Sequence, residues 1–362
     1  MSSSSSSSQQ LPRTYKALCW PQENADNLEM KEFEWRTPKQ GQVVIRVHQC
    51  GINSTDNIGR FNLIGTVRYP TIPGCNVVGE VVQVGEGVKH LKQGQHVAAI
   101  LSHKGLAEYV VAHELFCCVL NDKQKSMEEV VVASYHGARI DGSIRRFIRE
   151  FEQEDHGRCS EINKMLGFEG SGCVAVYGEG GCARIALDIL RHHCHSSSSS
   201  SSRCVSKDTK IVLLASSDKW SAQDYGIEQS NLICVNKGGD FVNKELRQRG
   251  GAKFILAVDQ PQEGLESILD GMRYRAEMVV LNPFRDQPIR LSLGNMIAKD
   301  LSVRAPTWVD SKCIERALEL VEKQKIKLGI NKYQFDQNQV NQAFKEVESR
   351  SKFDAPVIFV HS

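Results

Sequence analysis

The sequence contains no long apolar run. No stretch approaches the roughly 18 residues that a membrane helix needs, and residues 1–10, a serine run followed by glutamines, lack the apolar segment of a secretory signal. Basic residues form no block either, since the formal net charge is only +2 and the two signs are interspersed. These absences argue against a membrane or a nucleic acid as partner. We therefore expect a cytoplasmic protein whose residues 1–12 are a disordered leader.

Regularly spaced cysteines are also missing. The chain has twelve cysteines, but they are scattered over 362 residues and do not form the disulfide framework of a small secreted domain. A chain of this length buries a core large enough to fold without crosslinks. We expect reduced thiols that pack in the interior and, at about 150 residues per domain, two domains.

Strand-like segments dominate the first third of the chain. Short segments of alternating or apolar character are separated there by glycine and proline, and the clearest are residues 42–48, 77–84, 95–100 and 107–111. This pattern predicts an all-β, barrel-like unit over residues 13–127.

Strands and helices alternate after this unit. The predicted helices cover residues 127–151, 182–191, 243–249 and 265–272, and the predicted strands cover 174–177, 211–215, 254–258 and 278–281. Such alternation predicts βαβ units on a parallel sheet over residues 128–300, with a serine-rich insert at 192–207. The tail, residues 301–362, has helices at 312–322 and 337–349 and a strand at 356–360. This mixed layout leaves open whether the tail packs back on the first unit.

A glycine-rich turn follows the predicted strand that ends at Tyr177. Gly178, Gly180 and Ala183 form the pattern GxGxxA, a variant of the dinucleotide fingerprint, and Gly181 lies within it. Gly178 allows a tight turn, Gly180 lets the backbone approach a pyrophosphate, and Ala183 keeps the next helix close to the sheet. The helix N-terminus then offers N–H groups to the phosphates. The pattern predicts a dinucleotide site, although a tight turn without a ligand has the same glycines.

The tip of the next predicted strand bears on the choice of nucleotide. Ser216, Ser217 and Lys219 suit the 2′-phosphate of NADP, whereas Asp218 suits the ribose diol of NAD. We favour NADP, and NAD stays the alternative.

Several motifs follow one another in the first unit. Residues 50–56 with Arg60 are similar to the pattern GVNPxD…R, residues 72–85 to IPGxExxGxVxxVG, and residues 94–97 and 105–109 to GDRV and GxxAEY. In this order the motifs resemble the medium-chain dehydrogenase/reductases of the quinone-oxidoreductase branch. The resemblance implies an α/β protein with a GroES-like β-barrel catalytic domain and a Rossmann doubly wound parallel sheet. It also implies a tail that returns to the first unit and a cleft between the units for cofactor and substrate.

The same resemblance bears on zinc. Zinc-dependent members have a cysteine at the position of Asn53 and a His-Glu pair at the positions of Cys75 and Asn76, and they add a four-cysteine site after GDRV. Residues 97–109 contain no cysteine. A catalytic zinc needs three protein ligands, and only Cys75 offers one. The resemblance therefore implies a zinc-free member.

In that branch, hydride passes from the nicotinamide of NADPH to a quinone or to the β-carbon of an enone, so the partner is a small-molecule substrate. By resemblance Asn53 and Asp56 line the nicotinamide end, and Arg60 lies nearby as an orienting group. Asn53 as a turn former and Asp56 as a helix N-cap are the structural alternatives.

Departures from the family pattern keep a second hypothesis open. The segment that lies beside the nicotinamide is replaced around residues 135–139, and glycines of the pattern are absent after Asp259 and at Asn282. A side chain where the backbone must approach a ligand costs close contact. A catalytically degenerate pseudoenzyme that senses cofactor or acts as a scaffold is therefore the alternative. The resemblance further implies a homodimer through an edge strand near residues 301–305.

Metal-ligand residue types also gather at residues 192–195, with Cys204 beyond them. Neighbouring residues at a helix end point in different directions, so few can converge on one ion. We interpret this segment as a solvated helix end.

Overall fold

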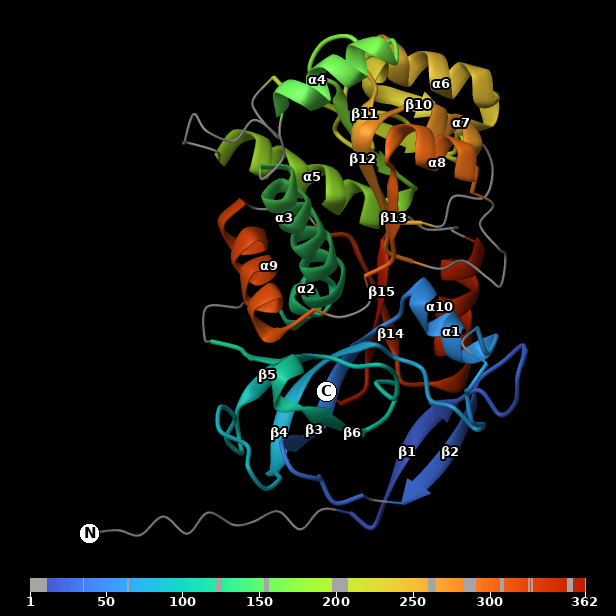
Figure 1. Cartoon of the computed structure of the whole chain (residues 1–362). Coiled ribbons are helices and arrows are strands. Elements are labelled where there is room, and N and C mark those ends of the chain that lie inside the picture. Colours follow the sequence, from blue (N-terminus) through green and yellow to red (C-terminus); the bar gives the residue numbers. More distant parts are fainter. Residues whose placement is uncertain are drawn as a thin grey trace.

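The computed structural model has two units, joined by a helical segment and by the returning C-terminal tail (Figure 1). It describes residues 12–34, 36–63, 65–121, 126–152, 156–196, 208–259, 265–282, 291–306, 309–324, 326, 328–349 and 354–361. Most of the expected leader, residues 197–207 of the serine-rich insert and Cys204 lie outside these residues. None of the described helices is long and apolar enough to cross a bilayer.

The first unit is built on a seven-stranded sheet of order β14-β15-β3-β4-β5-β7, with β6 paired to β3. Its strands from the first third of the chain are β3 (Gln42–Gly51), β4 (Asn76–Val84), β5 (His96–Ile100), β6 (Tyr109–His113) and β7 (Cys117–Val119). A separate antiparallel pair consists of β1 (Thr14–Cys19) and β2 (Glu29–Glu34). The alternating residues Val43, Ile45 and Val47 of β3 are buried in the core of this unit, as a half-buried antiparallel strand requires.

Short helical turns follow two of these strands. The 3-10 helix η1 (Ser54–Asp56) and α1 (Asn57–Arg60) come after β3, and η2 (Glu114–Phe116) comes between β6 and β7. Of the residues predicted to be catalytic, Asn53 precedes η1, Asp56 ends it and Arg60 ends α1.

A long helical segment leads to the second unit. It consists of α2 (Met127–Val132), the π-helical turn η3 (Ala133–Gly137) and α3 (Ala138–Glu152). Ser126 begins it, because its hydroxyl accepts the Glu129 amide at 3.3 Å as an N-cap does. A helix at residues 127–151 is thus confirmed, and the π turn that interrupts it is a feature often found at functional sites.

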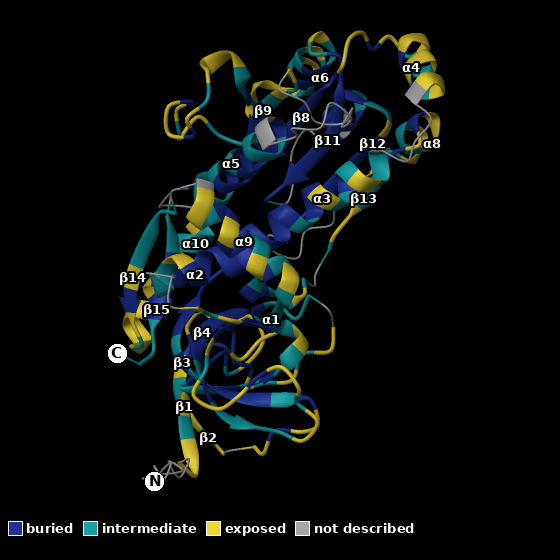
Figure 2. Cartoon of the chain, turned by 90° about the vertical axis from the view of Figure 1, so that its left-hand side faces the viewer, coloured by how far each residue is buried: buried dark blue, intermediate teal, exposed yellow. Residues whose placement is uncertain are grey.

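The second unit has a six-stranded parallel sheet of order β10-β9-β8-β11-β12-β13. Its strands are β8 (Cys173–Tyr177), β9 (Lys210–Ala215), β10 (Leu232–Cys234), β11 (Ala252–Ala257), β12 (Met272–Val280) and β13 (Ser302–Arg304). Every residue of β8 and β11 is buried, which a sheet covered on both faces requires (Figure 2). The order of the strands reverses at β8, as in a doubly wound dinucleotide-binding sheet.

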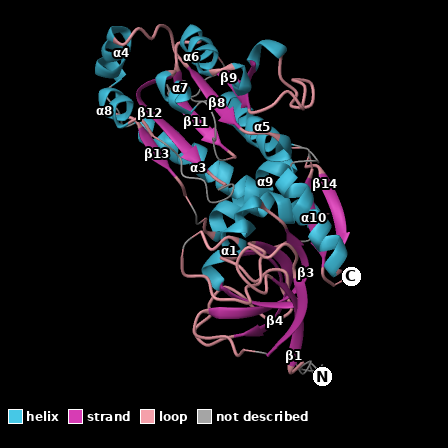
Figure 3. Ribbon diagram, turned by 90° about the vertical axis from the view of Figure 1, so that its right-hand side faces the viewer, coloured by secondary structure: helices cyan, strands magenta, loops and turns pink. Residues whose placement is uncertain are grey.

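Helices cover both faces of this sheet (Figure 3). They include α4 (His156–Met165), α5 (Gly180–Ser196), α6 (Gly239–Gln248), α7 (Leu265–Asp270) and α8 (Leu293–Lys299), with the short turns η4 (Gln229–Asn231) and η5 (Val235–Lys237). Val174 and Val176 share a core with α3 and α5, and Cys173 and Ala175 share the opposite core with α6 and α7.

Two features of this unit differ from the prediction. The helix predicted at residues 265–272 ends at Asp270, and Met272 begins β12. Between them Gly271 packs against α6, where an added Cβ would lie 2.6 Å from Leu246 Cδ1. Helix α4 was not predicted, because its sequence is charged and has little apolar periodicity. It is fixed to β12 by Asn163, whose Oδ1 accepts the Tyr274 amide at 2.9 Å.

The tail returns to the first unit. Helix α9 (Ser311–Gln324) packs beside α3, and β14 (Ile330–Gln334), α10 (Gln337–Ser349) and β15 (Ala355–Phe359) follow. Strand β15 pairs antiparallel with β3 and parallel with β14. The expected return segment begins at residue 301, yet β13 still pairs with β12 in the parallel sheet, so the strands that rejoin the first unit are β14 and β15.

Candidate functional site

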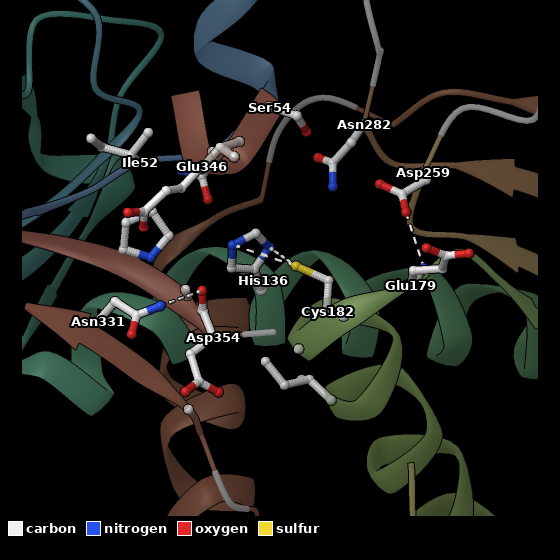
Figure 4. A pocket seen from close by; sticks show the side chains of 18 of the residues that line it. Ile52, Ser54, His136, Glu179, Cys182, Asp259, Asn282, Asn331, Glu346 and Asp354 are labelled. Carbon is white, nitrogen blue, oxygen red and sulfur yellow. Dashed lines mark hydrogen bonds between the residues drawn. The ribbon is translucent and has the colours of Figure 1, made fainter. Parts of the chain in front are cut away.

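A cleft lies between the two units, next to the point where the order of the parallel strands reverses (Figure 4). Its empty volume, with the open mouth included, is about 930 Å³. Its lining comes from the first unit, the helical segment, the second unit and the returning tail. It includes Ile52, Asn53, Ser54, His136, Glu179, Gly180, Gly181, Cys182, Trp220, Asp259, Asn282, Asn331, Glu346 and Asp354. In doubly wound sheets this is the place where ligands bind.

The predicted glycine turn forms one wall of this cleft. Gly178 has a φ of 134° and leaves no room for a side chain, since a Cβ there would lie 2.6 Å from Val258 Cγ2. Gly180 has a φ of 70° and begins α5, and Ala183 is fully buried against the sheet. Gly180 and Gly181 line the cleft. The turn therefore has the shape that the fingerprint predicts.

Backbone amides of this turn donate hydrogen bonds to side chains of the protein itself. The Glu179 amide donates to Asp259 Oδ2 at 3.1 Å, and the Gly180 amide donates to the Tyr225 hydroxyl at 3.2 Å. The Glu179 side chain accepts from the Ser216 hydroxyl at 2.9 Å and from the Ser217 amide. Two carboxyl groups thus stand at the N-terminus of α5, where the resemblance places a pyrophosphate.

The residues predicted to select the nucleotide lie at the tip of β9, where Ser216 and Ser217 contact the Glu179 carboxylate. Besides its bond to Glu179, Ser217 accepts the Lys219 amide through its Oγ at 3.2 Å. The Lys219 ammonium lies 5.2 Å from the ring centre of Trp220. Ser216, Ser217 and Lys219 are not among the described residues that line the cleft, but their neighbours Glu179 and Trp220 are.

Asn53 reaches the cleft from the end of β3. Its Nδ2 donates to Asn76 Oδ1 at 2.8 Å, and Asn76 Nδ2 donates to the Val131 carbonyl at 2.8 Å. Both side chains are buried. The two amides are therefore held in one orientation by the start of the helical segment.

Asp56 lies beneath this pair. One oxygen accepts the Asn53 amide at 2.9 Å, and the other accepts the Gly74 amide at 2.8 Å and the Cys75 thiol at 3.1 Å. Burial raises the pKa of Asp56 to about 6, although all three hydrogen bonds act to lower it. Burial, followed by the charge of Asp56, raises the pKa of Cys75 well above its usual value.

Arg60 is buried within the first unit. Its Nε donates to the Ala25 carbonyl at 2.8 Å, and its guanidinium pairs with Glu348. The guanidinium carbon lies 5.0 Å from the ring centre of Trp20 and 4.9 Å from that of Phe61. Among the described residues, neither Asp56 nor Arg60 lines the cleft, whereas Asn53 does.

Two of the departures from the family pattern, at residues 135–139 and at Asn282, come together in one hydrogen-bonded network. The Tyr135 hydroxyl donates to Thr55 Oγ1 at 2.8 Å, and Thr55 donates to Asn282 Oδ1 at 3.1 Å. Arg139 Nη1 donates to both Tyr135 and Asn282 at 3.0 Å, and Nη2 donates to the Leu281 and Pro306 carbonyls. Asn282 Nδ2 donates to the Val258 carbonyl at 2.7 Å. The network ties η1 of the first unit to the sheet of the second.

A thiol–imidazole pair in the cleft was not predicted. Cys182 Sγ lies 3.3 Å from His136 Nδ1, and both residues line the cavity (Figure 4). Burial, followed by the charge of Arg139, lowers the pKa of His136 to about 3. Burial also raises the pKa of Cys182 to about 12. Both groups are therefore neutral near pH 7. The only sequence signal was a cysteine inside the fingerprint, and its partner is 46 residues away.

The helix end at His193 and Cys194 is less solvated than we expected. The His193 side chain is mostly buried, and its Nε2 lies 2.8 Å from Asp141 Oδ1 on α3. Cys194 is buried in the core. The difference arises because α3 covers this face of α5 and supplies a buried carboxylate to pair with the imidazole.

Comparisons with known proteins agree with this architecture. Residues 39–149 match the family "Alcohol dehydrogenase GroES-like domain". The alcohol dehydrogenase patD of Penicillium expansum is 31% identical over 308 residues, which cover 81% of this chain and 82% of that protein. A chloroplast envelope quinone oxidoreductase homolog of Arabidopsis thaliana is 38% identical over 96 residues. These are 25% of this chain and 29% of the homolog, so the match spans less than a third of that relative.

Among solved structures, the Escherichia coli quinone oxidoreductase complexed with NADPH superposes with a TM-score of 0.70. The match covers 96% of this chain and 100% of that one at 18% identity, a level that shows the fold alone. The predicted combination of a GroES-like domain and a Rossmann sheet is thus confirmed. The match to the alcohol dehydrogenase covers most of both chains, and the fold agrees with it. The chain therefore belongs to the medium-chain dehydrogenase/reductase superfamily.

Proposed function

We propose that this chain is an NADPH-dependent oxidoreductase of the quinone and enone reductase type, which transfers hydride without zinc. The observation that carries the proposal is the meeting of Gly180, Gly181 and Asn53 in one cleft beside the strand reversal. The dihydronicotinamide would supply the hydride. The resemblance to quinone oxidoreductases supports the substrate class, a quinone or a carbonyl-conjugated alkene.

The chain's own residues would hold and orient the reactants. Gly178 and Gly180 give the backbone turn that a pyrophosphate approaches, and α5 directs its positive end toward it. Asn53, whose amide is fixed by Asn76, would position the nicotinamide end. Such positioning accounts for much of the rate in reactions that need no nucleophile.

The proposal of NADPH rests on Lys219 and the serines at the tip of β9. A lysine beside two hydroxyl groups suits a 2′-phosphate. Glu179 works against it, because its carboxylate accepts hydrogen bonds from Ser216 and Ser217. We therefore predict that Glu179→Gln strengthens binding of NADPH about tenfold and of NADH much less, measured by titration of nucleotide fluorescence. Equal gains for both nucleotides would contradict this assignment of the 2′-phosphate site.

Zinc independence is supported by the side chains that this chain has at the positions of the zinc ligands of zinc-dependent relatives. Asn53 and Asn76 offer amides bonded to each other, and zinc in proteins is bound by thiolate, imidazole or carboxylate. The buried Cys75 thiol donates to Asp56, and its raised pKa opposes the thiolate form. Turnover should therefore survive dialysis against a chelator.

A second candidate function is favoured by the carboxyl groups of Glu179 and Asp259 at the glycine turn. Negative charge at a helix N-terminus competes with a phosphate for the same N–H groups. A degenerate member that has lost turnover, and that acts as a cofactor sensor or scaffold, would have such a turn.

Nucleotide titration separates these functions. The purified chain is titrated with NADPH and NADH, and fluorescence and thermal unfolding are followed. Binding of NADPH, followed by its oxidation with a panel of quinones and enones, is expected. Binding without turnover favours the sensor, and a folded protein that binds neither nucleotide overturns the reductase.

The proposed compartment is the cytoplasm, in which the described cysteines, all free thiols in the structure, would stay reduced. We also propose a homodimer through β13, the outer strand of the parallel sheet.

A further inference from the structure

Two histidines and a glutamate meet on the first unit, outside the cleft. His48 is on β3, Glu80 on β4 and His96 on β5, three neighbouring strands of the seven-stranded sheet (Figure 1). Their possible ligand atoms all lie within 4.8 Å of one another. The ring centres of His48 and His96 are 5.5 Å apart.

The register of the strands explains this meeting. Glu80 pairs directly with His96 across β4 and β5, so both side chains leave the sheet on one face. Arg46 pairs directly with Glu80 from β3. The register of β3 shifts between Val47 and Gln49, which makes His48 the extra residue of a bulge. A bulge redirects a side chain, and here the His48 ring lies beside Glu80 and His96.

The charged neighbours of the cluster leave one carboxylate oxygen of Glu80 for a metal ion. Among the described residues, no hydrogen bond links the two imidazoles to each other or to Glu80, whose ion pair is with Arg46. Arg46 Nη2 holds Glu80 Oε2 at 2.6 Å and leaves Oε1 available. The groups facing His48 are His96, Arg46, Glu80 and His361, and the pKa of His48 is lowered, first by burial.

We propose that His48, Glu80 and His96 form a binding site for a divalent transition-metal ion of the zinc type, with water as the remaining ligand. Two imidazoles and one carboxylate are a common ligand set for such ions. A tetrahedral ion with bonds of about 2.0–2.1 Å spaces its ligand atoms about 3.4 Å apart. The side chains must therefore move inward, and the exposed His96 ring has room to do so.

The site is chemically distinct from the positions that hold catalytic zinc in relatives. Those correspond to Asn53, Cys75 and Asn76, beyond the end of β3 and at the start of β4. Nitrogen donors disfavour Ca²⁺ and Mg²⁺, which select oxygen ligands. Since the ligands come from three strands, binding would stabilise the sheet by mass action. Arg46, which holds the carboxylate, would act from outside the ligand set.

Cobalt binding to the full chain, stripped of metal with a chelator, tests the proposal. Co²⁺ is added with a thiol reductant excluded, and visible absorption and thermal unfolding are recorded. We expect one Co²⁺ per chain, visible bands of a nitrogen–oxygen site, no near-ultraviolet thiolate band, and a raised midpoint of unfolding. Zn²⁺ should displace Co²⁺.

Three variants assign the site. His96→Ala, at an exposed position, and Glu80→Gln should each weaken Co²⁺ binding at least about tenfold. His90→Ala, an exposed histidine outside the cluster, should leave binding unchanged. A thiolate band, binding that His96→Ala and Glu80→Gln do not alter, or no binding by the folded wild type would each overturn the proposal.

Discussion

Asp56 is a buried carboxyl group whose proton is held more tightly in the folded chain than in the unfolded one, since burial raises its pKa from 3.8 to about 6. Its contribution to stability is therefore greatest below pH 3.8 and is lost as the pH rises to about 6, by up to roughly 3 kcal/mol. We predict that, as the pH rises over this interval, the unfolding free energy of the wild type falls relative to that of Asp56→Asn. Urea unfolding at several pH values measures it.

The variant also carries a cost that does not depend on pH. The asparagine amide can accept from Asn53 or Gly74, but its NH₂ group then faces the other N–H donor, at a cost of about 1–3 kcal/mol. Only the pH-dependent part reports the carboxyl group. Parallel curves for the two proteins between pH 4 and 7 would show that Asp56 does not titrate as described.

Gly178 lies at a position of the turn where a side chain has no room. Its φ is 134°, a backbone conformation that disfavours a side chain. A Cβ added there would also lie 2.6 Å from Val258 Cγ2 and 2.9 Å from Asp259 Oδ2. Gly94 has a φ of 85° and open space around it, so it isolates the backbone cost. We predict that Gly178→Ala destabilises the fold by about 2 kcal/mol more than Gly94→Ala and weakens nucleotide binding as well. Equal losses of stability in chemical denaturation would refute the steric argument.

At the scale of elements, η1 and the π turn are joined through Thr55 and Tyr135, whose hydroxyl groups are 2.8 Å apart. A double-mutant cycle with Thr55→Val and Tyr135→Phe should give a coupling energy of about 1 kcal/mol, because each change removes the same partly buried hydrogen bond. The exposed pair Glu319 and Lys323, 3.0 Å apart on α9, is the matched control and should couple by under about 0.5 kcal/mol. Additive effects at Thr55 and Tyr135 would show that the network is not cooperative.

The elements that the sequence predicts best are those specified by neighbouring residues. The succession of β8, the glycine turn and α5 is local, and the prediction and the structure agree there. Helix α4 has no apolar stripe, and its place depends on Asn163 reaching β12, so a single segment could not reveal it. The surroundings of Asp56 come from Gly74 and Cys75, which only the folded chain brings near. The sequence alone could not decide which of Asn53, Asp56 and Arg60 lines the cleft, because their surroundings form only in the folded chain.

At the scale of the whole molecule, the chain closes on itself through β15, which pairs with β3 over Gln49–Gly51. The cleft therefore takes its lining from both ends of the sequence as well as from the glycine turn. The resemblance to a known family predicted this return, which periodicity alone left open. The His136–Cys182 pair had no such precedent in the motifs, and it depends on how α5 meets the helical segment.

Exposed apolar side chains lie on the helix that precedes the outer strand of the parallel sheet. Helix α8 presents Leu293 and Ile297, 69% and 81% exposed, one turn apart and therefore on one face. This helix precedes β13, whose outer edge has no partner strand in the described sheet. An exposed apolar pair beside an open strand edge is typical of an interface. We predict that the wild type sediments as a dimer and that Ile297→Glu shifts it to the monomer. Leu115→Glu, an equivalent change at an exposed leucine of the first unit, should leave the dimer intact. A monomeric wild type, or dissociation by both changes, would contradict an interface at this edge.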